Sequence, residues 1–271
     1  MKKNPKTTPS SLRTSLAFLA FGIVILAASI IFNWQVLAFI GLGLVFWGAI
    51  FALSRPGKFV DSSLLDSTAN SVYSTLDRLI NDLNYNGRGY YIPAYPKDAF
   101  LPEYYKNLKE SVVFISDENF TGLPSVEELA AGKFISDKNR GVFITSPGSG
   151  VLNQMEHRLN LDFSSIPLQE LCGLLPRCMT EFFNLAQEMD LQVIDESKVR
   201  LSVHGILYES LYASFANDGA IQKSVTLLGC PVVSAVACAI AKSSGKTVVI
   251  QEQQFMPKIA GVEAIFSYAK G

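Results

Sequence analysis

Two stretches near the N-terminus contain no charged residue, and they constrain the fold more than any other feature of the sequence. Residues 16–32 and 36–53 are almost wholly apolar. An α-helix rises ~1.5 Å per residue, so each run is just long enough to cross a hydrocarbon core of ~30 Å. The turn between them is polar and places Trp34 at the expected membrane–water interface. The sequence therefore predicts a transmembrane helical hairpin.

Basic residues flank the two runs, and residues 1–58 hold no acidic residue. The positive-inside rule assigns the flanks that carry Lys and Arg to the cytoplasm. We therefore predict a multi-pass protein of the cell membrane with two spans, whose N- and C-termini are both cytoplasmic. The predicted segments are a basic N-terminus (1–13), the hairpin (14–54) and a cytoplasmic domain (55–271). The basic residues are Lys2, Lys3, Lys6, Arg13, Arg55 and Lys58.

Three glycines in the second run, Gly41, Gly43 and Gly48, offer a small-residue surface on which the first helix can pack closely. Two alternatives to a membrane hairpin stay open. The first run could be a signal peptide, because it follows a basic segment and ends near small residues. Both runs could instead be buried core helices of a soluble protein. A second charge-free run follows almost at once, with basic residues on both flanks, and this favours the hairpin.

The charge of the chain changes sign at the end of the hairpin. The whole chain has a net charge of −1, but residues 59–271 hold 17 of the 23 basic residues and all 24 acidic ones, a net charge of −7. An acidic domain has the wrong sign to bind a polyanion, so we expect no nucleic-acid partner. The apolar content of 49% excludes a disordered chain, and four cysteines in 271 residues exclude a disulfide miniprotein.

Helical and strand patterns alternate along the rest of the chain. Apolar residues at helical spacing predict a helix over 60–83, with Asp61 and Ser62 as caps and Asn86-Gly87 as its end. Further helices are predicted after the turn at 147–150, over 166–189 with a kink or break at Pro176, and over 232–244. Strands are predicted at 90–93, 112–115, 142–145, 191–194, 199–203, 247–251 and 262–268.

The order of these elements in the C-terminal half is α-β-β-α-β-β. The economical packing for this order is an antiparallel sheet with helices on one face, because the apolar sides of both layers are then buried together. We therefore predict an α+β cytoplasmic domain, with a possible internal division near residues 146–165. The two α-β-β units could be structural repeats without sequence similarity.

Short motifs occur along nearly the whole chain. They are residues 55–59, Tyr90-Tyr91-Ile92-Pro93, Thr145-Ser146-Pro147-Gly148-Ser149-Gly150 before a helix with Glu156, Gly229-Cys230-Pro231 with Ser234-Ala235, and residues 245–250. In this combination the chain resembles an uncharacterised archaeal membrane-protein family. That family has a two-span N-terminal hairpin, and its cytoplasmic α+β part is a domain of unknown function. The resemblance implies a location and an architecture, but no activity.

The stretch Ser146-Pro147-Gly148-Ser149-Gly150, between a strand and a helix, is the first candidate binding site. Glycines before a helix allow backbone N–H groups to face an anion, and the helix dipole adds to the attraction. The stretch lacks the lysine of a Walker loop and the spacing of a dinucleotide-binding loop. Ser146, Gly148, Ser149 and Gly150 are candidate ligand-binding residues. The alternative is an ordinary turn in which Ser146 or Ser149 caps the helix.

The turn Gly229-Cys230-Pro231 is the second candidate site. A cysteine at a helix N-terminus can have a lowered pKa, so Cys230 could be a reactive thiol. Ser234 lies one turn into the helix that follows, so Gly229, Cys230 and Ser234 complete the candidate ligand-binding set. The alternative is a small buried residue beside a helix that begins at a proline, where small side chains permit close packing.

The sequence predicts no metal site, no cofactor and no catalytic residue. Its four cysteines lack the Cys-x-x-Cys spacing of a zinc site, and a cytoplasmic domain keeps them reduced. We expect His157 and His204 to be structural or surface residues, because nothing in the sequence pairs them with a nucleophile. Seven aromatic residues from Tyr85 to Tyr105 could form a surface for a partner or the membrane, or simply cover the sheet.

Three functions are compatible with these features. The first is a non-enzymatic binding or scaffolding module held at the lipid bilayer by residues 16–32 and 36–53, with a protein partner or a second copy of the chain as its ligand. The second is a membrane-anchored sensor that binds a small anion at one of the two helix N-termini. The third is a thiol-dependent enzyme that uses Cys230. The sequence shows no recognisable catalytic constellation, which favours the first.

Overall fold

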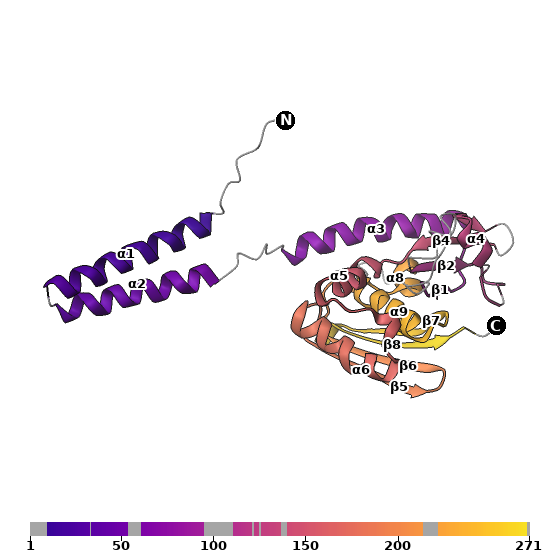
Figure 1. Cartoon of the computed structure of the whole chain (residues 1–271). Helices are drawn as coiled ribbons and strands as arrows, with labels where there is room; N and C mark the ends of the chain where they lie inside the picture. Colours follow the sequence, from indigo (N-terminus) through magenta and orange to yellow (C-terminus); the bar gives the residue numbers. More distant parts are fainter. Residues whose placement is uncertain are drawn as a thin grey trace. The chain divides into compact units, whose positions relative to one another are not determined.

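The computed structural model describes residues 10–32, 34–53, 61–94, 111–120, 122–124, 126–136, 140–213 and 222–269. The chain divides into two compact units, Met1–Val60 and Asp61–Gly271. The first unit contains a helical hairpin. The second unit, which we call the body, contains every strand of the described chain (Figure 1).

The hairpin consists of α1 (Ser10–Phe32) and α2 (Gln35–Leu53), which pack along each other. A Cβ atom placed on Gly22, Gly41 or Gly48 would lie 2.7–2.9 Å from a side-chain atom of the facing helix, so these glycines allow the close approach. Gly43 does not take part, because no described atom lies within 4 Å of the position that its Cβ would occupy. The packing predicted for Gly41 and Gly48 is confirmed, and that for Gly43 is wrong.

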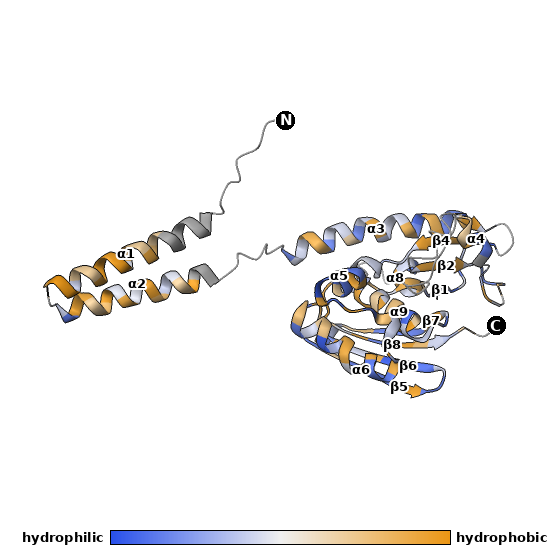
Figure 2. Ribbon diagram, in the orientation of Figure 1, coloured by the Kyte–Doolittle hydropathy of each residue, from blue (hydrophilic) through white to orange (hydrophobic). Residues whose placement is uncertain are grey.

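Figure 2 shows that the described part of the hairpin is predominantly apolar. Among the described residues, the one helical segment both long and apolar enough to cross a membrane is Lys223–Ser244. That segment belongs to the body, where 89% of its apolar window is buried, as is typical of a core helix. The hairpin contributes two shorter apolar stretches, Ala17–Phe32 and Gln35–Ile50.

The body is built around one eight-stranded sheet in which every pair of neighbouring strands is antiparallel. The spatial order is β3-β4-β2-β1-β7-β8-β6-β5, so strands from both halves of the chain join in one layer. The strands are β1 (Gly89–Ile92), β2 (Val112–Ser116), β3 (Ile135–Ser136), β4 (Gly141–Thr145), β5 (Glu188–Asp195), β6 (Lys198–His204), β7 (Val248–Met256) and β8 (Gly261–Tyr268).

Most helices cover one face of this sheet. Val113, Val142 and Leu201 point to that face and pack in the main core, whereas Phe114 and Phe143 point to the opposite face. α9 is the central helix of the main core, because every residue from Pro231 to Lys242 is buried. The helices that contribute to this core are α3 (Ser62–Leu83), α5 (Ser149–Leu159), α6 (Leu168–Arg177), α7 (Ser210–Ala213), α8 (Lys223–Leu228) and α9 (Pro231–Ser244).

One short helix departs from the prediction that all helices lie on one face. α4 (Val126–Ala130) supplies Leu129 and Ala130 to a second, smaller core on the opposite face. This core also includes Phe114 and Phe120, whose ring centroids are 5.3 Å apart, and it covers β1, β2, β4 and the start of β7. No described helix covers β5, β6 and β8 on that side, where most side chains are polar, as is common for an antiparallel sheet. We call this surface the open face.

The predicted order α-β-β-α-β-β is present in the C-terminal half as α6, β5, β6, α9, β7 and β8, with α7 and α8 inserted before α9. The start of α3 is also as predicted, because Asp61 Oδ1 accepts a hydrogen bond from the Ser63 N–H at 2.9 Å. Its last residue, Leu83, is also as predicted, but the residue that ends the helix is Asn84, which adopts a left-handed conformation with φ 55°, and not Asn86-Gly87. Asparagine tolerates this conformation better than most residues.

The helix predicted over 166–189 is the largest boundary error. α6 ends at Arg177, directly after Pro176, and continues as one π-helical turn at Cys178–Phe182. A proline supplies no N–H for the helical ladder, which explains the change of helix type. The last two predicted helical residues, Glu188 and Met189, instead begin β5, because their backbone pairs with β6.

Candidate functional site

The structure brings together three of the seven predicted ligand-binding residues. Ser146 follows β4, Gly148 precedes α5, and Ser234 lies in the first turn of α9. The Ser146 and Ser234 hydroxyl oxygens are 2.9 Å apart, and the Gly148 N–H donates to Ser234 Oγ at 3.0 Å. Ser149 stays local, since its hydroxyl donates to the Ser146 carbonyl at 2.8 Å. Gly150 is exposed and belongs to the surface of α5.

This serine cluster is filled with protein atoms. Cys238 Sγ donates to Ser146 Oγ at 2.9 Å, and Tyr91 Oη lies 3.1 Å from Ser234 Oγ. A Cβ atom on Gly148 would lie only 2.0 Å from the backbone nitrogen of Ala235, so the start of α5 packs directly on α9. The backbone donor that an anion would need at Gly148 is therefore already occupied. The arrangement fits a structural junction between two helices.

Tyrosine hydroxyls from three separate elements surround Gly229 and Cys230. Tyr73 of α3 donates to the Gly229 carbonyl at 2.6 Å, and Tyr91 of β1 donates to the Leu228 carbonyl at 2.5 Å. Tyr212 of α7 accepts a hydrogen bond from the Cys230 N–H at 3.1 Å. These bonds satisfy the backbone groups where α8 ends and α9 begins. Burial raises the pKa of all three tyrosine hydroxyls well above its ordinary value.

Cys230 is fully buried, and its environment does not favour a nucleophile. Burial raises the pKa of the thiol, although the Val233 N–H at the start of α9 acts in the opposite direction. A reactive cysteine needs an exposed thiolate, which a raised pKa and zero exposure both oppose. Gly229 has φ 65° and is closely approached by Val233, so its role is to permit the turn between the helices.

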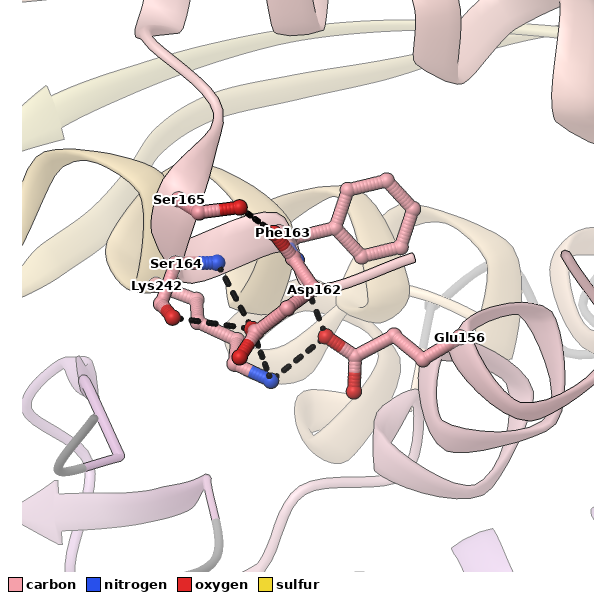
Figure 3. A network of polar contacts seen from close by, with 6 residues as sticks. All are labelled: Glu156, Asp162, Phe163, Ser164, Ser165 and Lys242. Atoms are coloured by element: carbon pink, nitrogen blue, oxygen red, sulfur yellow. Dashed lines mark hydrogen bonds and ion pairs between the residues drawn. The ribbon is translucent and has the colours of Figure 1, made fainter. Parts of the chain in front are cut away.

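A buried ion network joins α5 to the last turn of α9 (Figure 3). Lys242 Nζ is 2.5 Å from Glu156 Oε1 and 3.4 Å from Asp162 Oδ1, and both carboxylates point toward the ammonium group. The side chains of Lys242 and Glu156 are only 7% and 5% exposed. Glu156 also accepts the Phe163 N–H at 3.0 Å, and Asp162 accepts the Ser164 N–H at 3.0 Å. The network therefore fixes the segment between α5 and α6 onto α9.

Sequence reasoning missed most of the residues that form the tyrosine contacts around Gly229 and the buried ion network. Tyr73 and Tyr91 lie at apolar positions of a helix and a strand, so the pattern indicates burial but not the carbonyl that each hydroxyl contacts. Lys242 lies near the end of α9, where a basic residue is usual for the helix dipole, and its burial has no sequence signal. The sequence places Glu156 in the helix after the glycine turn, but it contains no signal that this carboxylate is buried against a lysine.

Solvent-accessible space lies elsewhere, on and beside the open face. One cleft of ≈1030 Å³ is bounded by residues 116–118, Phe120 and Gly122, by the β5–β6 turn at 196–198 and by the ends of β1, β7 and β8. Its charges are mixed, so they select neither anions nor cations. The charged lining residues are Arg88, Asp117, Glu118, Glu196, Lys198 and Lys246.

Two smaller hollows lie on the open face: one of ≈240 Å³ over β5 and β6, and one of ≈500 Å³ that extends from β5 across β6 and β8 to β7. Arg200 lines both of them and pairs with Glu263 at 3.0 Å. Asp190 lines the smaller hollow, and Glu252 and Ile194 line the larger one. The cleft and the two hollows are open to solvent, whereas the residues of the serine cluster are buried.

The remaining predicted features are dispersed. His157 is exposed, and His204 Nδ1 is 3.4 Å from a Glu188 oxygen. Within the described residues, no group of three or more His, Cys, Asp or Glu side chains could hold a metal ion. In the aromatic run, Tyr90 and Tyr91 are buried strand residues. Tyr95, Phe100, Tyr104 and Tyr105 lie outside the described residues, as do Arg55 and Lys58.

A comparison with known protein families matches residues 6–258 to the domain of unknown function DUF7982. Because the match spans most of the sequence, the chain belongs to this family. A search of curated proteins and a search of solved structures each find no match. The family match confirms the predicted resemblance as far as a domain of unknown function. It does not extend to an archaeal source or to a membrane location.

Proposed function

We propose that this member of the DUF7982 family is a membrane-anchored cytoplasmic binding or scaffolding module. In this proposal residues 16–32 and 36–53 span the bilayer, and the body binds a partner on the cytoplasmic side. The archaeal two-span family that the sequence resembles has the same layout. Membership of that membrane-protein family is part of the proposal. The observation that carries the proposal is the surface of the hairpin.

Large apolar side chains of the hairpin face outward on both helices. Phe21 and Ile30 of α1 are 69% and 81% exposed, and Phe39 of α2 is 77% exposed. Soluble proteins rarely expose apolar patches larger than a few hundred Å². The charge-free parts of the two helices, residues 16–32 and 36–53, hold 17 and 18 residues, or about 26 and 27 Å of helix, at the short end of what crosses the ~30 Å of a hydrocarbon core.

The turn of the hairpin supports the same arrangement. Ser29 Oγ donates to the Trp34 carbonyl at 3.1 Å, which closes the turn, and the Trp34 side chain is 65% exposed. Tryptophan is enriched at membrane–water interfaces. The basic residues at both ends of the hairpin then favour a cytoplasmic location for the termini and the body.

The interior of the body supports binding over chemistry. Cys230, the proposed nucleophile of the enzyme alternative, is fully buried. The sensor alternative needs the backbone N–H of Gly148 to bind an anion, but this N–H already donates to Ser234 Oγ. The accessible cleft and hollows lie instead on the outer side of the sheet, where a partner can reach them without a change of fold.

Cysteine labelling in cells tests the anchor and its orientation. In a Cys172→Ala background, the Trp34→Cys variant should react with a membrane-impermeant maleimide on intact cells. The Ser197→Cys variant, in the β5–β6 turn, should react only after permeabilisation. Labelling of the Ser197→Cys variant on intact cells would refute the orientation, and full release of the chain by alkaline carbonate would refute the anchor.

Purification tests the binding role. The chain, extracted in mild detergent with a cross-linker present, should retain a stoichiometric protein partner or a second copy of itself. A monodisperse monomer with nothing retained, from cells at native expression levels, would contradict the proposal.

A further inference from the structure

The two ends of the sheet differ in a way that suggests an interaction surface. β3, at one end, has two residues, whereas β5, at the other end, has eight. β5 pairs with β6 along one side, and no strand of the described chain pairs with its other side. A long edge strand presents a row of backbone N–H and C=O groups that can pair with another chain. β5 contains no proline and no lysine, two residues that commonly protect such edges, and its pairing with β6 is regular from Glu188 to Val193, before a shift of register at Asp195.

The charge of β5 itself is one-sided, although Lys198 and Arg200 lie on the neighbouring β6. Residues 188–196 hold four acidic residues and no basic residue. A second copy of β5 added in antiparallel orientation would bring like charges opposite each other, which is destabilising. An extended segment with positive charge would instead meet opposite charges. The acidic residues are Glu188, Asp190, Asp195 and Glu196.

The surface beside this edge can accommodate the side chains of an added strand. The hollow lined by Asp190 and Arg200 lies on the open face over β5 and β6, whereas the hollow lined by Ile194 and Glu252 extends from β5 across the sheet to β7. Because side chains of a strand alternate between faces, every second residue of an added strand would lie on the open face, on the side of the smaller hollow. Val193 and Ile194 are 40% and 53% exposed on opposite faces of β5. Both would contact apolar residues of the added strand.

We propose that β5 accepts a ninth strand from a basic, extended segment of a partner protein. Main-chain hydrogen bonds along the edge provide affinity, and the acidic side chains select for lysine and arginine. This inference rests on the proposed binding function, for which it names the surface and the chemistry of the partner.

The test uses the full chain in detergent micelles and the labelled peptide Lys-Val-Thr-Val-Lys-Val-Thr-Val-Lys as a probe. Fluorescence anisotropy should show saturable binding. The peptide Lys-Val-Pro-Pro-Lys-Pro-Pro-Val-Lys has the same charge but cannot form a β-ladder, and it should bind at least about tenfold more weakly. Equal binding of the two peptides would overturn the proposal, because attraction between charges alone would then explain it.

Two double variants test the position of the site. Glu188→Gln with Asp190→Asn should weaken binding of the first peptide by about fivefold, given the modest contribution of exposed charges. Asp82→Asn with Glu209→Gln removes the same charge from exposed positions outside β5 and should leave binding unchanged. An equal loss in both variants, or dimerisation of the chain through β5, would overturn the proposal. Retention of some other partner on purification would still support the broader binding function.

Discussion

The buried lysine at the end of α9 allows a quantitative test of the fold. Lys242→Met keeps most of the volume and apolar length of the side chain but removes its charge. The Glu156 side chain, 5% exposed, then loses an ammonium group that lies 2.5 Å away. Asp162 is less affected, because its side chain is 29% exposed and keeps its hydrogen bonds to Ser164.

The expected cost follows from the burial of both partners. Removal of one member of a buried ion pair destabilises a protein by about 3–5 kcal/mol, because the other charge stays in a medium of low polarity. For a domain of this size, 1 kcal/mol corresponds to a change in Tm of about 2–4 °C, so we expect a decrease of roughly 10 °C. Asp162→Asn, at a partly exposed position, should cost less than about 1 kcal/mol.

A double variant separates the charge from the packing. Glu156→Gln combined with Lys242→Met removes both charges, and it should recover most of the stability lost in Lys242→Met alone. Both tryptophans of the chain, Trp34 and Trp47, lie in the hairpin, so tryptophan fluorescence does not report on the body. Thermal unfolding of the full chain in micelles should be followed by far-UV circular dichroism instead. Equal stability of Lys242→Met and the wild type, or additive losses in the double variant, would refute the reasoning.

Three further predictions follow from single positions. Gly41→Leu should lower the thermal transition seen by tryptophan fluorescence, which reports on the hairpin, whereas Gly43→Leu should not, because only Gly41 faces α1. Gly148→Ala should sharply lower the Tm of the body, while Gly150→Ala, with open space at its Cβ, should raise stability by about 0.5–1 kcal/mol. Burial raises the pKa of the Cys238 thiol to about 12. The free energy of unfolding should therefore fall as the pH rises above about 8.5, because only the unfolded thiol ionises there. Urea denaturation at increasing pH should show a shallower decline for Cys238→Ala than for the wild type.

Much of the secondary structure could be predicted from the sequence. Apolar periodicity located α3, α9 and the buried strands, and the polar turn at 33–35 separated two helices. These features depend on residues within a few positions of each other, so a linear pattern contains the necessary information. The errors also have local causes: Asn84 adopts a left-handed conformation that no pattern announces, and Pro176 changes the helix type without ending the helix at once.

The candidate site was predicted less well. The two glycine turns lie at helix starts, as the sequence indicates, but their donors are occupied. Whether a donor such as the Gly148 N–H is free depends on Ser234, which is 86 residues away in the chain. Sequence alone cannot measure this separation in space, so a structural junction and a ligand site have the same local pattern.

The sequence by itself determined that two charge-free helical runs precede an acidic α+β body, because hydropathy, charge and periodicity are properties of neighbouring residues. Only the tertiary structure decided that Lys242 is buried against Glu156, that the serine cluster is closed and that β5 has an unpaired edge. These features join residues far apart in the chain, and they follow from strand order and helix packing. The physical reason is that burial and pairing depend on the whole fold, whereas propensity depends on the local chain.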